Sequence, residues 1–478
     1  MGLLVLDRKN WTRSGAVLAI LLGLAACERA YNSVNRPQLA LAPISSEERI
    51  ASTRMRGEAP VPAFRPRHTA HLGRDPGPSQ QLAAAQRPSG SLGGFLTSPN
   101  PPKLNMPQPG LDGPLGSFRA KLAALEAGTR SDPVVIVHLG DSHVASDSFT
   151  RGIRSRLQAR FGDAGRGAVI PANAFKYAQA QSVSLSSSGP WQSSMSLKSG
   201  NGVYGLSGVR VESATSSAVM KLTADQPFDW AQVTVVTGPG QGQFDVIVDG
   251  HKQRFSANAP GQGAKSFRVD RGGKTLTISP AGGGKLSLLH WSTGKDGPGV
   301  RYVNFGQISA TVSVTRRWND QAIANDLAAL KPDLIVYGFG TNEGYDDNVD
   351  PASYRDYVRG FLGKLKADAP QVDIMILGAA DGLRRRGGKS CGNGWNQPPK
   401  LAALRDAMQG LAQEIDAGYW NWAQAMGGEC SIDQWARSGL AAKDRVHLTS
   451  KGYDRSAEAF YQALVGPLDR PVVVADKR

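Results

Sequence analysis

Cysteine, histidine and acidic side chains are scarce in this sequence. Its 478 residues include 3 Cys and 7 His, and 40 Asp and Glu stand against 55 Lys and Arg. The histidines form no His-Glu-x-x-His pattern, and residues 387–390 (Gly-Gly-Lys-Ser) lack the upstream glycine of a phosphate-binding loop. Zinc-finger spacings and RNA-binding aromatic signatures are absent as well. We therefore expect no metal, no other cofactor and no nucleic-acid partner, and the net charge of +15 suits an anionic surface or polymer.

The N-terminal apolar run, residues 16–26, is shorter than the roughly 20 residues that a membrane-spanning helix needs. Because it follows Lys9 and Arg13, it is typical of a signal-peptide core. Residues 24–27 (Leu-Ala-Ala-Cys) resemble a bacterial lipoprotein box, which implies cleavage before Cys27 and lipid attachment to its sulfur. We expect residues 1–27 to be a signal peptide and the protein to be a periplasmic lipoprotein, anchored in the outer membrane by its lipid. An ordinary signal peptide or an uncleaved anchor is the alternative.

Composition and periodicity divide the rest of the chain. Residues 28–115, rich in Pro, Arg, Ala, Ser and Gln, are typical of a disordered linker. Short alternating runs between Asp-Gly and Gly-Gly turns predict a β-sandwich at residues 191–298. Strand and helix patterns alternate on either side of it, with strands at 333–340 and 372–378 and helices at 352–367, 400–417 and 451–465. The sequence thus predicts an α/β domain, residues 116–190 and 299–478, with a parallel sheet between helices and an inserted all-β module.

Ser142 ends a strand-to-helix turn. The apolar run 134–139 stops at Gly140-Asp141-Ser142, and a helical pattern follows at 147–157. A serine there projects from the end of a buried strand, and its backbone N–H points to where negative charge can develop. That is what an acyl-transfer nucleophile needs, although a plain capped turn has the same sequence signature.

Three further stretches can complete such a site. Asn342 follows a strand and can donate its side-chain amide to an oxyanion, and Asp444 can orient His447 as the base for Ser142. The stretch 299–310 can offer a backbone N–H from Gly306 or Ser309. Each stretch also has a structural interpretation: a turn asparagine, a surface ion pair or a buried histidine.

Residues 140–143, 340–343 and 444–447 resemble blocks I, III and V of the SGNH (GDSL-type) hydrolases, and the resemblance spans about 133–464. The predicted β-module and residues 420–428 resemble the peptidoglycan O-acetylesterase branch, whose inserted domain is like a carbohydrate-binding jelly roll. The resemblance implies a flavodoxin-like sheet, with Ser142 as nucleophile, His447 as base and Asp444 as its orienter. The implied oxyanion hole combines the Ser142 N–H, the Asn342 side chain and a block II N–H, from Gly306 or from Ser309, where the family usually has glycine.

With Cys27 assigned to lipidation, Cys391 and Cys430 remain. In an oxidising periplasm we expect them to form one disulfide that closes a loop beside the active site, and two free thiols are the alternative.

We therefore predict a serine esterase that removes O-acetyl groups from an envelope polysaccharide, with peptidoglycan as the first candidate. An acyltransferase that moves acetyl or succinyl groups onto a periplasmic glucan or wall sugar would use the same triad. A non-catalytic glycan-binding lipoprotein is the third hypothesis. In it the β-module does the work, with Trp191 and Trp291 as candidate sugar-stacking rings. The alternative is a module that only shapes the cleft, with both rings buried, which is commoner for aromatic residues.

Overall fold

A computed structural model describes residues 113–175, 180–198 and 200–469. The predicted signal peptide, Cys27 and nearly all of the predicted linker lie outside these ranges. Within them, no helix combines the length and the apolar character that crossing a membrane requires.

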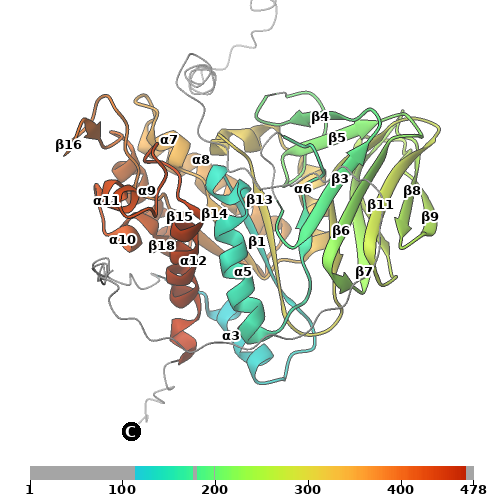
Figure 1. The fold of residues 1–478 in the computed structure, drawn as a ribbon, viewed down its shortest axis with the longest axis horizontal. Coiled ribbons are helices and arrows are strands. Elements are labelled where there is room, and N and C mark those ends of the chain that lie inside the picture. The colour runs from blue at the N-terminus through green and yellow to red at the C-terminus, as the bar shows by residue number, and fades with distance from the viewer. Residues whose placement is uncertain (1–112, 176–179, 199, 470–478) are drawn as a thin grey trace, which may run out of the picture. The chain divides into compact units, whose positions relative to one another are not determined.

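The α/β domain is built on a five-stranded parallel sheet (Figure 1). Its strand order places the second strand of the domain outside the first, as in flavodoxin-like folds, so the switch in direction falls between β1 and β14. The strands, in order across the sheet, are β13 (Val300–Gly306), β1 (Val134–Gly140), β14 (Leu334–Gly338), β15 (Asp373–Gly378) and β18 (Gly418–Asn421). The predicted doubly wound parallel sheet is confirmed.

Helices cover both faces of this sheet, which is why its strands are continuous apolar runs. Successive residues of β1 point to opposite faces: Ile136 belongs to the core that contains Phe149, and Val137 to the core that contains Val358. The first face packs against α3 (Gly116–Glu126), α5 (Ser148–Phe161) and α12 (Ser450–Val465). The second packs against α6 (Asp320–Leu330), α8 (Pro351–Asp368) and α9 (Leu401–Glu414).

Short elements gather at the carboxyl ends of the strands. They are α4 (Ser142–Ala145), η1 (Val312–Arg317), α7 (Thr341–Gly344), β16 (Ser390–Gly392), β17 (Trp395–Asn396), α10 (Trp422–Met426) and α11 (Ser431–Arg437), and η2 (Gly466–Asp469) follows α12. The helix predicted at 400–417 is shorter in the structure, because α9 ends at Glu414 and strand β18 begins at Gly418.

The β-module lies between α5 and β13 in the chain and consists of two antiparallel sheets. One has the order β10 (Gly263–Val269), β7 (Trp230–Thr237), β12 (Leu286–Gly294), β5 (Val209–Ser213), β4 (Gln192–Met195), with β2 (Gly167–Val169) also paired to β12. The other has the order β3 (Val183–Ser188), β6 (Val219–Phe228), β11 (Gly273–Gly282), β8 (Gln243–Val248), β9 (His251–Ser256). The antiparallel sheets therefore begin upstream of residue 191, the start that the sequence predicted.

A buried polar contact joins the module to the α/β domain. His290 on β12 lies with Nε2 3.0 Å from Oδ1 of Asp326 on α6, and the other oxygen of Asp326 accepts the Leu206 N–H at 2.8 Å. Trp291 beside it is fully buried, so it cannot stack on a sugar as the sequence suggested. Trp191 is partly exposed, and its ring nitrogen donates to the Ser188 carbonyl.

Candidate active site

Ser142 is the first residue of α4, directly after the end of β1. Asp141 caps this short helix, because its Oδ1 accepts the His143 N–H at 3.0 Å. Glycine is required beneath it: a Cβ on Gly306 would lie 2.2 Å from the Ala145 nitrogen, so a side chain there would displace α4. The sequence thus fixes Ser142 at the switch point of the sheet, where ligands of such folds bind.

Ser142, His447 and Asp444 form a continuous hydrogen-bonded chain. The Ser142 Oγ lies 2.9 Å from Nε2 of His447, and Nδ1 of the same ring lies 2.7 Å from Oδ2 of Asp444. The second carboxylate oxygen of Asp444 accepts the backbone N–H groups of Val446 and His447, both at 3.0 Å. All three side chains remain partly exposed, so a substrate can reach them.

The charge of Asp444 sets the tautomer of His447. Burial acts to raise the pKa of Asp444, but the hydrogen bond and charge of His447 and the two backbone N–H groups outweigh it and lower the pKa to about 2. An ionised carboxylate can only accept, so Nδ1 of His447 carries the proton and Nε2 accepts the Ser142 hydroxyl. This arrangement lets the imidazole remove a proton from the serine.

His143, which the sequence reasoning did not assign, packs beside His447 with ring centroids 5.5 Å apart. Its Nδ1 lies 2.9 Å from the Tyr453 hydroxyl, and burial, followed by the charge of His447, lowers the pKa of His143 to about 3. His143 is therefore neutral, so it adds no charge repulsion when the His447 ring beside it takes a proton. Its position next to Ser142 was the available sequence signal.

Two segments, at the carboxyl ends of β14 and β13, carry the candidate oxyanion donors. Asn342 lies in α7, directly after β14, and one of its amide hydrogens is given to the Ala310 carbonyl at 2.8 Å. Ser309 has φ +63°, a left-handed conformation that glycine adopts freely and a serine adopts at a cost of roughly 1–2 kcal/mol. That conformation accounts for a glycine preference at this position. Ser309 is partly exposed, whereas Gly306 is covered by α4, which favours Ser309 as the backbone donor.

Residues 282–455 match the model of the GDSL-like lipase/acylhydrolase family, and this range contains Asn342, Asp444 and His447. This part of the chain is therefore similar to that family. A solved structure of a peptidoglycan O-acetylesterase is similar to the chain, with 28% sequence identity and a TM-score of 0.63, and the match covers 74% of this chain and 97% of that one. Ser142 lies outside the matched range, but it follows β1, which pairs with β13 and β14 inside that range.

Other solved structures match less well. A family two carbohydrate esterase from Clostridium thermocellum in complex with cellohexaose has 12% identity, a TM-score of 0.27 and coverage of 54% of this chain and 95% of that one. A Bacillus subtilis protein has 15% identity, a TM-score of 0.29 and coverage of 58% and 88%. Among curated proteins, none matches this chain.

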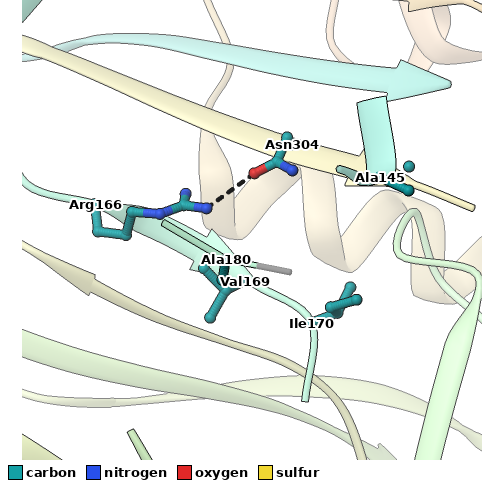
Figure 2. A pocket seen from close by; sticks show the side chains of 7 residues that line it. Ala145, Arg166, Val169, Ile170, Ala180 and Asn304 are labelled. Atoms are coloured by element: carbon teal, nitrogen blue, oxygen red, sulfur yellow. Dashed lines mark hydrogen bonds between the residues drawn. The ribbon is translucent and has the colours of Figure 1, made fainter. Parts of the chain in front are cut away.

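A small pocket lies against α4, where Ala145 and Gly306 of the α/β domain meet Val169 and Ile170 at the end of β2 of the module (Figure 2). Arg166 and Asn304 also line it, and the Arg166 Nη2 donates to Oδ1 of Asn304 at 2.9 Å. The Asn304 amide donates in turn to the Val144 carbonyl at 3.3 Å, and Arg166 pairs with buried Asp147. Because the triad does not line this pocket, we assign it to support of the nucleophile turn.

A hairpin formed by β16 and β17 borders the loop that carries Asp444 and His447, and a disulfide ties it to the start of α11. Cys391 on β16 is bonded to Cys430, with their Cα atoms 5.6 Å apart. At the base of the hairpin the Leu383 N–H donates to the Arg445 carbonyl at 2.8 Å, two residues before His447. The ring of Trp395 contacts the guanidinium groups of Arg385, at 3.7 Å, and Arg445, at 4.9 Å.

The titratable groups do not assemble into a metal centre in the part of the chain that the structure describes. No group of three or more His, Cys, Asp or Glu side chains there has the arrangement to hold an ion. The chemistry that the described residues offer is that of a serine, an imidazole and a carboxylate.

Proposed function

We propose that the protein is a serine esterase of the cell envelope that removes O-acetyl groups from a polysaccharide, with peptidoglycan as its first candidate. The hydrogen-bonded chain from Ser142 through His447 to Asp444 carries the proposal. The similarity to a peptidoglycan O-acetylesterase structure supports the substrate class. The lipoprotein box at Cys27 supports location in the periplasm, with a lipid anchor in the outer membrane.

In the first step the Ser142 Oγ attacks the acetyl carbonyl carbon while Nε2 of His447 accepts the serine proton. The carbonyl oxygen becomes an oxyanion, held by the Ser142 N–H, the free amide hydrogen of Asn342 and a backbone N–H that we assign to Ser309. The carbon–oxygen bond to the sugar then breaks, and His447 returns its proton to the leaving sugar alcohol. The acetyl group remains as an ester on Ser142.

In the second step a water molecule attacks this ester and gives its proton to His447. The tetrahedral intermediate collapses as the bond between its carbon and the Ser142 Oγ breaks, and His447 gives its proton to restore the Ser142 hydroxyl. Acetic acid leaves and ionises to acetate. Asp444 stays ionised throughout and stabilises the imidazolium that forms in each half-reaction.

The positive charge of the segment 379–400, which contains the β16–β17 hairpin, favours an acidic glycan as the substrate. Residues 379–400 contain five cationic residues, Arg384, Arg385, Arg386, Lys389 and Lys400, and one acidic residue, the buried Asp381. Arg384 pairs with Asp347 and Lys389 with Glu429, whereas the exposed Arg385 and Arg386 have no carboxylate partner among the described residues. We infer that these two arginines bind a carboxylate of the glycan or of its attached groups.

The test measures acetate release from purified O-acetylated peptidoglycan by wild type and by Ser142→Ala. Ser438→Ala, which changes an exposed serine after α11, serves as the control. We expect wild-type and control rates to agree and the Ser142→Ala rate to fall by about 10⁴-fold or more. Unchanged acetate release by Ser142→Ala would overturn the esterase proposal.

The same assay separates the two other functions. With a deacetylated oligosaccharide added as acceptor, an esterase still releases acetate, whereas an acyltransferase moves the acyl group to the sugar, which mass spectrometry detects. Succinylated glucan tests the second acyl group. Binding of the polysaccharide with no acyl release or transfer would identify a glycan-binding protein.

A further inference from the structure

We propose that Glu343 is a positioning residue, which holds the segment 309–312 so that its backbone can serve the oxyanion. The inference rests on the proposed function. It concerns a side chain that the mechanism above does not use.

Glu343 and its neighbour Asn342 hold the same segment at two points. Oε1 of Glu343 accepts the Val312 N–H at 2.6 Å, and Nδ2 of Asn342 donates to the Ala310 carbonyl at 2.8 Å. Ser309, whose N–H we assign to the oxyanion hole, directly precedes Ala310 and lies three residues before Val312. The left-handed backbone of Ser309 is held in place by the residues that follow it, so losing the Val312 contact would let Ser309 relax to another conformation.

The surroundings of Glu343 disfavour a charge. The residue is 5% exposed, and its second oxygen, Oε2, is buried without a hydrogen-bond partner among the described residues. The groups that face it are Asp141 from the nucleophile turn, Tyr337 from β14 and Tyr354 from α8, and no cation is among them. Burial, reinforced by the charge of Asp141, raises the pKa of Glu343 to about 8 despite the backbone N–H groups that it accepts.

The neutral and ionised forms therefore have different consequences. At pH 7 the neutral carboxyl accepts the Val312 N–H through Oε1, and its proton resides on Oε2. Above pH 8 the proton leaves, and a buried carboxylate then faces Asp141 with one oxygen unpaired. The Val312 N–H still binds the carboxylate, but the added negative charge beside the segment 309–312 opposes the negative charge that develops on the oxyanion.

The experiment compares wild type, Glu343→Gln and Glu343→Ala by kcat and KM for p-nitrophenyl acetate between pH 6 and pH 10, corrected for spontaneous hydrolysis. Glutamine keeps a neutral acceptor for the Val312 N–H and cannot ionise. We expect its kcat at pH 7 to lie within about threefold of wild type, and alanine to lower kcat by about 10²-fold with little change in KM. The control is Glu126→Gln, which changes an exposed carboxyl group on α3.

The pH profile distinguishes positioning from a structural role. Wild-type kcat should fall as pH rises through about 8, and Glu343→Gln should stay level over the same range. An alkaline fall shared by Glu343→Gln, or an unchanged kcat in Glu343→Ala, would overturn the inference. If alanine unfolds the protein, the glutamine profile alone decides it. Failure of the esterase proposal itself is seen separately, as turnover that survives Ser142→Ala.

Discussion

His447 follows Ser142 by 305 positions in the chain, yet its Nε2 lies 2.9 Å from the serine Oγ. The contact requires the turn after β1 and the loop before α12 to meet at one edge of the sheet. The parallel register of β1 with β13 and β14 brings Gly140, Gly306 and Gly338 level at that edge. The triad is therefore a product of strand pairing, and substitutions in it should change chemistry more than folding.

Asp444→Asn should lower kcat on O-acetylated peptidoglycan by about 10³–10⁴-fold while leaving KM nearly unchanged. An asparagine can donate to Nδ1 of His447, which favours the tautomer that cannot accept the Ser142 proton. Steady-state kinetics at pH 7 would check this. A loss of less than tenfold would show that Asp444 does not orient the base.

Acid should weaken the protein partly through Asp444. Its pKa in the folded state, about 2, lies below its ordinary value of 3.8, so the carboxylate stabilises the fold above about pH 4, and this contribution is lost as pH falls toward 2. Urea unfolding of wild type and Asp444→Asn should differ by at most about 2 kcal/mol at pH 7, and the difference should vanish near pH 2. A difference that grows on acidification would contradict the assignment.

Asn342→Ala should lower kcat by about 10²–10³-fold, because it removes one oxyanion donor and also frees the Ala310 carbonyl. The rate with p-nitrophenyl acetate and the thermal midpoint should be measured together. If the midpoint drops with no change in kcat, Asn342 is a turn residue of the kind that its Gly-rich surroundings also allow.

Arg385→Gln combined with Arg386→Gln should raise KM for O-acetylated peptidoglycan about tenfold or more and leave p-nitrophenyl acetate turnover unchanged, because the small ester has no carboxylate. The effect should shrink as salt is added. Arg355→Gln combined with Arg359→Gln makes the same change in charge on α8, where both arginines bind Glu414, and serves as the control. Equal effects of the two pairs would indicate a general response to net charge.

Removing the disulfide should loosen the attachment of the β16–β17 hairpin to the start of α11. Cys391→Ser combined with Cys430→Ser removes a cross-link between residues 39 apart and should cost about 2–4 kcal/mol of unfolding free energy. Guanidinium unfolding of the variant and of wild type would measure the difference. We expect KM for the polysaccharide to rise with it, since the base of the hairpin contacts Arg445.

Sequence periodicity was sufficient for the architecture because each parallel strand is an apolar run with helical patterns around it. The runs ending at Gly140 and Gly338 carried most of that signal. Periodicity failed for short or polar strands: β2 has three residues, and β3 is mostly serine, so the start of the module was set too late. Strand β18, of four residues, was missed, and the predicted helix 400–417 continued past the end of α9 at Glu414 up to the start of this strand.

Ser142, Asn342, Asp444 and His447 were recognisable because their chemistry is tied to the ends of predicted elements. The predicted Cys391–Cys430 pair is a disulfide in the structure. Glu343 and His143 belong to the same motifs, but their behaviour depends on burial and on partners distant in sequence, which no local pattern reveals. Trp291 shows the converse, since an aromatic residue that looked available for stacking lies inside the module.

The two ends of the β-module are tied together at the border of the sheet. The Val300 N–H donates to the Gly162 carbonyl at 2.8 Å, and the Ala164 N–H donates to the Val300 carbonyl at 3.3 Å. During synthesis, β1 therefore emerges long before its neighbour β13 and has no partner on that side until the whole module has been made. Domains generally fold as units as they leave the ribosome, so we expect the sandwich to form first and to deliver Val300 to Val134 with its register already set.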